Sequence, residues 1–237
     1  MVSSESEVRS QKSVESAASY YLRPIITSLM KKALILDLDN TIYPVSPIAN
    51  DLFDKLFALL DECAEKNDTI DWVNAKDELT RRHYHLVADK YNFGNELTEK
   101  GNNLLKDLAY EEPMQPFAEY EHIRLSPLTK FLVTTGFTKL QWSKVKMLGI
   151  EKDFAEIHIV DPGLSTQTKK DVFADILKRH DYTAGDVLVI GDDPESEIKA
   201  ASELGIETFL FDPENKHPEA AVSHRSVSLK EALTVLS

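Results

Sequence analysis

The strongest constraint on this chain is a short apolar run that ends in two aspartates. Residues 33–41 read Ala-Leu-Ile-Leu-Asp-Leu-Asp-Asn-Thr, which places Asp37 and Asp39 two positions apart. Such a run predicts a buried strand, and side chains two apart on a strand point to the same side. Asp and Asn are also common turn residues, so an ordinary strand end is the alternative. Because paired carboxylates repel without a cation or a shared proton, the pattern favours a divalent-metal or acid/base site.

Strand-like and helical stretches alternate along most of the chain. Apolar runs that predict strands lie at 33–37, 131–134, 157–160, 187–190 and 207–211. Helical patterns lie at 138–148, 169–180, 195–204 and 228–236. Short apolar strands that alternate with helices form parallel sheets covered by helices on both faces. We therefore predict an α/β fold with a Rossmann-like parallel sheet of about five strands.

The stretch between the first two predicted strands is too long for a simple crossover. Three helical patterns occupy residues 47–113: Ile48–Lys66, Asp71–Tyr91 and Asn95–Tyr110. We predict an all-helical insertion over 47–113, and a core made of residues 30–46 and 114–237.

The first 29 residues differ in composition from the rest. Serines alternate with glutamates there, without apolar periodicity, which is typical of a disordered or extended tail. Met30-Lys31-Lys32 leads directly into the first predicted strand, as a natural start would. We predict that residues 1–29 are a tail, or that Met30 is the true start.

Charge and cysteine content limit the partners of this protein. The formal net charge is −13, which argues against a nucleic-acid backbone or an anionic membrane as the main partner. No apolar run reaches the ~18 residues of a membrane span. Cys63 is the only cysteine, so a disulfide within the chain is excluded, and a reducing cytoplasm is the expected setting.

Three further segments accompany the strand of Asp37. A strand-like run ends in Thr134-Thr135-Gly136, a Lys169-Lys170 pair begins a helical pattern, and a last apolar run ends in Gly-Asp192-Asp193, with Glu197 downstream. Together with Asp37-Leu-Asp39-Asn-Thr, these segments resemble, in order, the four motifs of the haloacid dehalogenase (HAD) superfamily. The resemblance covers about residues 30–237, and it implies that the helical insertion is a C1 cap.

The resemblance also implies roles for the acidic residues. Asp37 is the nucleophile that attacks phosphorus and forms an aspartyl-phosphate. Asp39 protonates the leaving oxygen and then takes a proton from the hydrolytic water, while its backbone carbonyl binds Mg²⁺. Asp192 is the principal metal carboxylate from the last motif, and Asp193 and Glu197 support it.

The remaining motif residues are expected to hold the phosphoryl group. The Thr134 hydroxyl and the backbone N–H groups of Thr135 and Gly136 bind its oxygens. One lysine of the pair neutralises the charge of the intermediate; we favour Lys169, with Lys170 as the alternative. The chain departs from the usual pattern at Glu197, where aspartate is usual, and at Thr135, where asparagine is common.

These expectations point to a Mg²⁺-dependent phosphomonoester hydrolase that acts on a small phosphorylated metabolite. Dehalogenase members lack an acid at the position of Asp39. The run from Asp37 to Pro44 resembles pyrimidine 5′-nucleotidase-like members, so a nucleoside 5′-monophosphate is the expected substrate. A sugar phosphomutase and a non-catalytic HAD-like binding protein are the alternatives. The sequence predicts no oligomeric state.

One cluster in the insertion is open to two interpretations. Its members are basic or imidazole side chains close together in the sequence: Arg81, Arg82, His83 and His85. They would either contact the distal part of a substrate or form a solvated helix face, and the second is the more common case.

Overall fold

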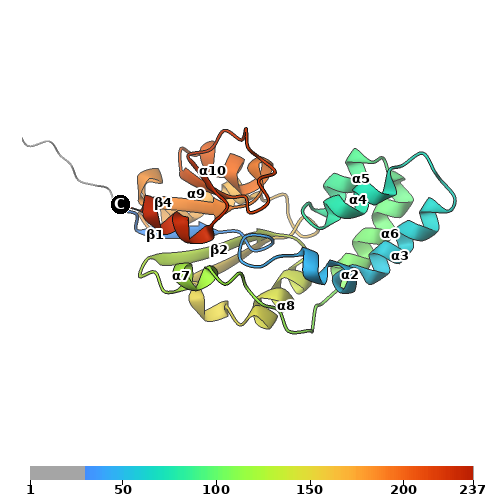
Figure 1. Ribbon diagram of the computed structural model, residues 1–237, viewed down its shortest axis with the longest axis horizontal. Coiled ribbons are helices and arrows are strands. Elements are labelled where there is room, and N and C mark those ends of the chain that lie inside the picture. Colours follow the sequence, from blue (N-terminus) through green and yellow to red (C-terminus); the bar gives the residue numbers. More distant parts are fainter. Residues whose placement is uncertain (1–29, 237) are drawn as a thin grey trace, which may run out of the picture. The chain divides into compact units, whose positions relative to one another are not determined.

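The computed structural model describes residues 30–236, so the predicted tail at 1–29 lies outside the described residues. A six-stranded parallel sheet, in the order β3-β2-β1-β4-β5-β6, forms the centre of the fold (Figure 1). The strands are β1 (Ala33–Leu36), β2 (Thr129–Thr135), β3 (Glu156–Val160), β4 (Val187–Gly191), β5 (Glu207–Phe211) and β6 (His224–Ser226). The predicted α/β fold is confirmed. The sixth strand was not predicted, because His-Arg-Ser carries no apolar pattern.

The central strands are buried on both faces by two separate layers of helices. Side chains of β1 alternate between them: Leu34 and Leu36 belong to one apolar cluster, and Ala33 and Ile35 to the other. The first layer contains α7 (Tyr120–Arg124), α8 (Thr138–Leu148) and the 3₁₀ helix η5 (Leu229–Val235). The second contains α9 (Lys169–Arg179) and α10 (Lys199–Ser202). Every residue of β1 is therefore at most 1 % exposed.

The segment between β1 and β2 is helical and has an apolar cluster of its own. Before α7, its helices are η1 (Ser46–Ile48), α2 (Ala49–Leu52), α3 (Asp54–Ala64), α4 (Trp72–Leu79), α5 (Tyr84–Lys90) and α6 (Gly94–Asp107). We call residues 46–107 the helical insertion. In α6, Leu97, Gly101 and Leu105 face inward at a spacing of four, and a Cβ on Gly101 would lie 2.2 Å from the Tyr84 ring. That this segment is a separate domain stays a prediction.

Several predicted helices are shorter or more broken than the patterns indicated. The helix expected over Ile48–Lys66 is interrupted at Phe53, whose φ and ψ are −110° and 18°. The one expected over Asp71–Tyr91 is split by Thr80–His83, because His83 is extended with ψ 140°. At Phe53 and at Thr80–His83 the backbone leaves the helical conformation, although the apolar pattern of the sequence continues through both places.

The C-terminal helical patterns also differ from the prediction. The stretch expected as one helix at 195–204 is a π-helical segment, η4 (Pro194–Ile198), followed by α10, and Ser196 is non-helical. The last helix is the 3₁₀ helix η5. Two other 3₁₀ turns, η2 (Glu151–Asp153) and η3 (Ala184–Asp186), precede β3 and β4. No helix among residues 30–236 is both long and apolar enough to cross a membrane.

Candidate active site

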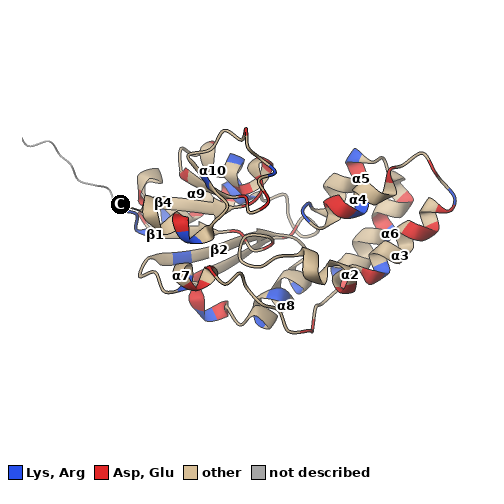
Figure 2. Cartoon of the chain, viewed as in Figure 1, with Lys and Arg blue, Asp and Glu red and all other residues tan. Residues whose placement is uncertain are grey.

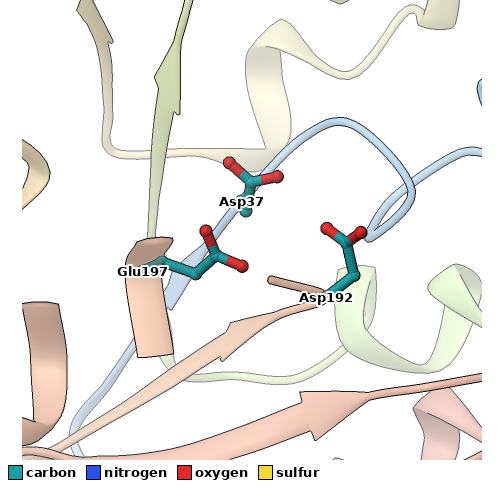
Figure 3. Close-up of side chains that lie close together, drawn as sticks. All are labelled: Asp37, Asp192 and Glu197. Atoms are coloured by element: carbon teal, nitrogen blue, oxygen red, sulfur yellow. The ribbon is translucent and has the colours of Figure 1, made fainter. Parts of the chain in front are cut away.

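Three carboxylates meet at the carboxyl edge of the sheet. Asp37 follows β1, Asp192 follows the neighbouring β4, and Glu197 projects from η4. One oxygen of each lies within 4.8 Å of the others, and Figure 3 shows the three side chains turned toward a shared space. Because β1 and β4 are hydrogen-bonded in register, with Leu36 opposite Ile190, the residues that follow them are brought together.

A buried lysine bridges two of these carboxylates. Lys169 Nζ lies 2.6 Å from Asp37 Oδ1 and 2.8 Å from Glu197 Oε2. Lys169 is the first residue of α9, whose start is fixed by a capping box between Thr168 and Asp171. The alternative, Lys170, instead pairs with Glu203 at 2.8 Å on the surface. The helix start thus determines which lysine enters the site.

The electrostatics of this cluster favour a bound cation. Burial raises the pKa of Asp37 to about 7, against the opposing effect of Lys169. Burial, together with Glu197 and Asp37, raises the pKa of Asp192 well above its usual value. Burial would lower the pKa of Lys169, but Asp37 and Glu197 outweigh it and raise it. The single ammonium of Lys169 is therefore insufficient to neutralise the negative charge of the three carboxylates.

A magnesium ion fits this donor set. Mg²⁺ takes oxygen ligands and is usually bound by one or two carboxylates with waters and substrate oxygens. Asp37 and Asp192 supply such oxygens. Both oxygens of Glu197 already accept hydrogen bonds, from Lys169 and from the Asp193 backbone N–H at 2.8 Å. Asp193 itself accepts from the Glu195 N–H at 2.8 Å and caps η4.

The glycine before Asp192 makes room for Glu197. A Cβ on Gly191 would lie 2.1 Å from Glu197 Oε1 and 2.5 Å from its Cδ. Glu197 is only 2 % exposed. Burial would raise the pKa of Glu197, but Lys169 and the Asp193 N–H outweigh it and lower it. The Glu in place of Asp is accommodated here as a buried, ionised partner of Lys169.

Asp39 lies among three side-chain donors. Lys144 Nζ contacts its two oxygens at 2.8 and 3.1 Å, Gln141 Nε2 donates at 3.0 Å, and the Tyr43 hydroxyl also donates. Burial would raise the pKa of Asp39, but Lys144 and the other donors outweigh it and lower it. Asp39 is therefore an oriented, ionised carboxylate.

The residues after β2 lie beside these groups. The buried Thr134 hydroxyl accepts from Gln141 Nε2 at 2.7 Å, which leaves its own proton free to donate. The Gly136 N–H, expected to bind a phosphoryl oxygen, donates instead to the Val160 carbonyl at 3.0 Å. This bond extends the β2–β3 ladder by one residue. Gly136 therefore cannot offer the N–H that the sequence interpretation assigned to it.

A cavity of about 490 Å³ opens above these residues. Its wall includes both aspartates of the first motif, Thr134, Thr135, Gly136, Lys169, Asp192, Asp193 and Glu197. The cluster at 81–85 lines it from the opposite side, through Arg81, Arg82, His83 and His85. Arg81, His83 and His85 are partly buried there, whereas Arg82 is exposed, so the solvated interpretation still describes Arg82.

Comparison with protein families agrees with this geometry. Residues 31–205 match the family model of haloacid dehalogenase-like hydrolases. This chain belongs to that family. The match includes every residue that we placed in the site.

One curated protein and two solved structures resemble this haloacid dehalogenase-like hydrolase at low sequence identity. A protein of Halopiger xanaduensis named ribulose-1,5-bisphosphate 5-phosphatase is 23% identical over 227 residues, covering 86% of this chain and 94% of the relative. The family protein SP0104 of Streptococcus pneumoniae has a TM-score of 0.63 at 17% identity, with 88% of this chain and 99% of that chain covered. The HAD-hydrolase YfnB of Bacillus subtilis, described bound to magnesium, has a TM-score of 0.56 at 18% identity, with 87% and 99% covered.

Sequence reasoning missed the partners of Asp39 in this hydrolase. Gln141 and Lys144 are 1 % and 3 % exposed, on the same side of α8 as the core residues Leu140 and Val145. A signal was present, because polar residues three apart stand within the apolar stripe of a helix that begins just after Thr134. Tyr43 is fully buried four residues after Asp39 and gave no comparable signal.

Proposed function

We propose that this hydrolase is a Mg²⁺-dependent phosphatase of small phosphomonoesters that works through an aspartyl-phosphate. The observation that carries the proposal is the pairing of Asp37, 6 % exposed and 2.6 Å from Lys169, with a second acid, Asp39, two residues on. A carboxylate nucleophile needs no deprotonation, and a second acid serves proton transfer.

In the first half-reaction, Asp37 attacks phosphorus and the bond to the leaving oxygen breaks. Lys169 offsets negative charge on the carboxylate and on the phosphoryl group, and the Thr134 hydroxyl donates to a phosphoryl oxygen. The leaving oxygen takes a proton from Asp39. Since three donors hold Asp39 ionised, it must first gain a proton, and we expect this demand to slow substrates with poor leaving groups.

In the second half-reaction, water attacks the phosphorus of the aspartyl-phosphate and the bond to Asp37 breaks. Asp39 accepts the water proton, a role for which an ionised, oriented carboxylate is suited. A bound Mg²⁺ would supply positive charge that lets an anionic substrate approach Asp37. Asp37, Asp192 and the Asp39 backbone carbonyl would hold it, with Asp193 and Glu197 acting on the surrounding structure.

The substrate class follows from less direct observations. The run from Asp37 to Pro44 supports a nucleoside 5′-monophosphate. The name of the Halopiger relative supports a phosphorylated sugar instead. Both are small phosphomonoesters, and a cavity of about 490 Å³ is within the usual size range for small-ligand sites.

The test is phosphate release from a panel of nucleoside, pentose and hexose monophosphates and p-nitrophenyl phosphate, with Mg²⁺ and with chelator. We expect metal-dependent release that is confined to few natural substrates. Isomerisation of a sugar 1-phosphate without free phosphate would instead establish the mutase. Absence of release from every compound, in folded and metal-loaded protein, would support the non-catalytic alternative.

A further inference from the structure

The two sides of the cavity carry opposite charge. On the sheet side, five carboxylates and two lysines line it: Asp37, Asp39, Asp192, Asp193, Glu197, Lys144 and Lys169. Both lysines are engaged with carboxylates of the site. From the helical insertion, the charged lining residues are Arg81, Arg82 and Lys106, with no carboxylate among them. Figure 2 shows basic residues in the loop between α4 and α5.

Two of these cations are available to a ligand. Arg81 pairs with Asp77 of α4. Within residues 30–236, Arg82 and Lys106 make no ion pair and no side-chain hydrogen bond, and both are exposed. Asn102 and Asn103 line the cavity from the same helix as Lys106. The insertion thus offers the cavity two cations that have no ion-pair partner among the described residues, and two amides. Arg82 also lies near enough to Asp193 and Glu78 to lower the pKa values of these carboxyl groups against the effect of burial.

The loop with Arg82 is tied to the catalytic edge of the sheet. Asn40, the residue after Asp39, has φ 54°, a left-handed conformation that asparagine tolerates. Its Nδ2 donates to the Thr80 carbonyl at 3.3 Å, and its Oδ1 accepts from the Val45 N–H at 3.1 Å. Arg82 therefore lies two residues along the chain from Thr80, whose carbonyl is hydrogen-bonded to Asn40, the residue after Asp39.

We propose that the insertion wall is a second anion subsite, and that the substrate carries a second phosphate or carboxylate at the end remote from the scissile phosphate. Arg82 and Lys106 would bind that group, and Asn102 and Asn103 the hydroxyls between. This inference rests on the proposed function, because the remote end is defined by phosphate transfer at Asp37.

Physical chemistry favours an anion in this place. A guanidinium binds phosphate or carboxylate through two parallel hydrogen bonds, and an ammonium adds a point charge. The protein has a net charge of −13, so an anionic substrate is repelled at long range and must be held by local cations. A nucleoside 5′-monophosphate would leave Arg82 and Lys106 without a charged partner, whereas a compound with two anionic ends would use both sides of the cavity.

The test measures binding separately from turnover. Calorimetric dissociation constants are determined for the Asp37→Asn protein with Mg²⁺, using two matched pairs of compounds. Ribulose 1,5-bisphosphate against ribulose 5-phosphate tests a second phosphate, and 3-phosphoglycerate against glycerol 3-phosphate tests a carboxylate. We expect one compound with two anionic groups to bind about a hundredfold more tightly than its partner with one, since two charge-assisted contacts are each worth about tenfold.

Variants then assign the preference to the insertion wall. Arg82→Gln should lower the ratio of affinities within the preferred pair about tenfold, and the Arg82→Gln/Lys106→Gln protein about a hundredfold. Lys55→Gln is the control, because it removes an exposed cation of the same insertion that does not line the cavity. It should leave both the ratio and the turnover of the otherwise wild-type protein unchanged.

The outcomes separate this inference from the proposed function. Equal affinity within both pairs, or a ratio that Arg82→Gln does not alter, would overturn the second subsite. Failure of the wild-type protein to release phosphate from p-nitrophenyl phosphate with Mg²⁺ would overturn the phosphatase proposal, while the affinities still decide the subsite.

Discussion

Replacing Lys169 by methionine tests whether one buried cation holds the carboxylate cluster together. Lys169 is 7 % exposed and contacts Asp37 at 2.6 Å and Glu197 at 2.8 Å. Methionine keeps much of the side-chain volume but leaves both carboxylates without a counter-charge. Breaking a buried ion pair in this way costs about 3–5 kcal/mol. We expect Lys169→Met to lower the free energy of unfolding by about 3 kcal/mol at pH 8 without metal.

The loss should depend on pH in a defined direction. The pKa of Asp37 in the folded protein is already raised from 3.8 to about 7. We expect loss of the lysine to raise it further, and to raise the pKa of Glu197 above the 4.5 of the unfolded chain. The folded state then binds more protons than the unfolded state, so stability falls as pH rises above about 4. The deficit of Lys169→Met should therefore be larger at pH 8 than at pH 5, where the carboxyl groups are more protonated.

The measurement is urea denaturation at both pH values, followed by tryptophan fluorescence, with chelator present. Lys170→Met is the matched control, because Lys170 is the next residue of α9 and its partner Glu203 is on the surface. A surface pair is worth about 0–1 kcal/mol, so this variant should lose little. Equal losses in the two variants, or a larger Lys169→Met deficit at pH 5, would refute the reasoning.

Three other predictions address the acids. Asp37→Asn should abolish phosphate release while circular dichroism shows an intact fold; retained turnover would remove the nucleophile assignment. Asp39→Asn should reduce kcat most for alkyl phosphates, and an equal loss with an aryl phosphate would argue against its general-acid role. Arg179, at 2.6 Å, holds the pKa of Glu156 well below its usual range. Glu156→Gln should cost about 1 kcal/mol at pH 7 in urea denaturation and less at pH 3, because that stabilisation decreases as pH falls below 4.5 toward the lower pKa of the folded state; a cost independent of pH would contradict this assignment.

The sequence predicted the parts of the fold that repeat a simple pattern. Apolar runs identified five of the six strands, because buried parallel strands need little else. β6 was missed, since a short edge strand of His-Arg-Ser is defined by its pairing with β5 and not by its own side chains. The break at Thr80–His83 was also missed, because the apolar pattern of the two flanking helices runs through it.

The site residues that come shortly after a strand could be predicted from the sequence. Asp37, Asp192 and Glu197 follow strand ends, and the structure brings them together. The choice between Lys169 and Lys170 depended on where α9 begins, which a capping box decides. The use of the Gly136 N–H depended on strand pairing with Val160, which no local pattern reveals.

Because it carries Gln141 and Lys144, helix α8 contributes both to the apolar core and to the candidate active site. Their neighbours on the inward side, among them Leu140, Val145 and Leu148, pack against the sheet. A substitution in that packing, such as Val145→Ala, would shift the polar pair by the same backbone movement. In a mutational library, stability and turnover should thus decline together along this helix, and compensating changes should arise in the core and not at the acids. We therefore expect α8 to tolerate few substitutions when this enzyme adapts to a new temperature.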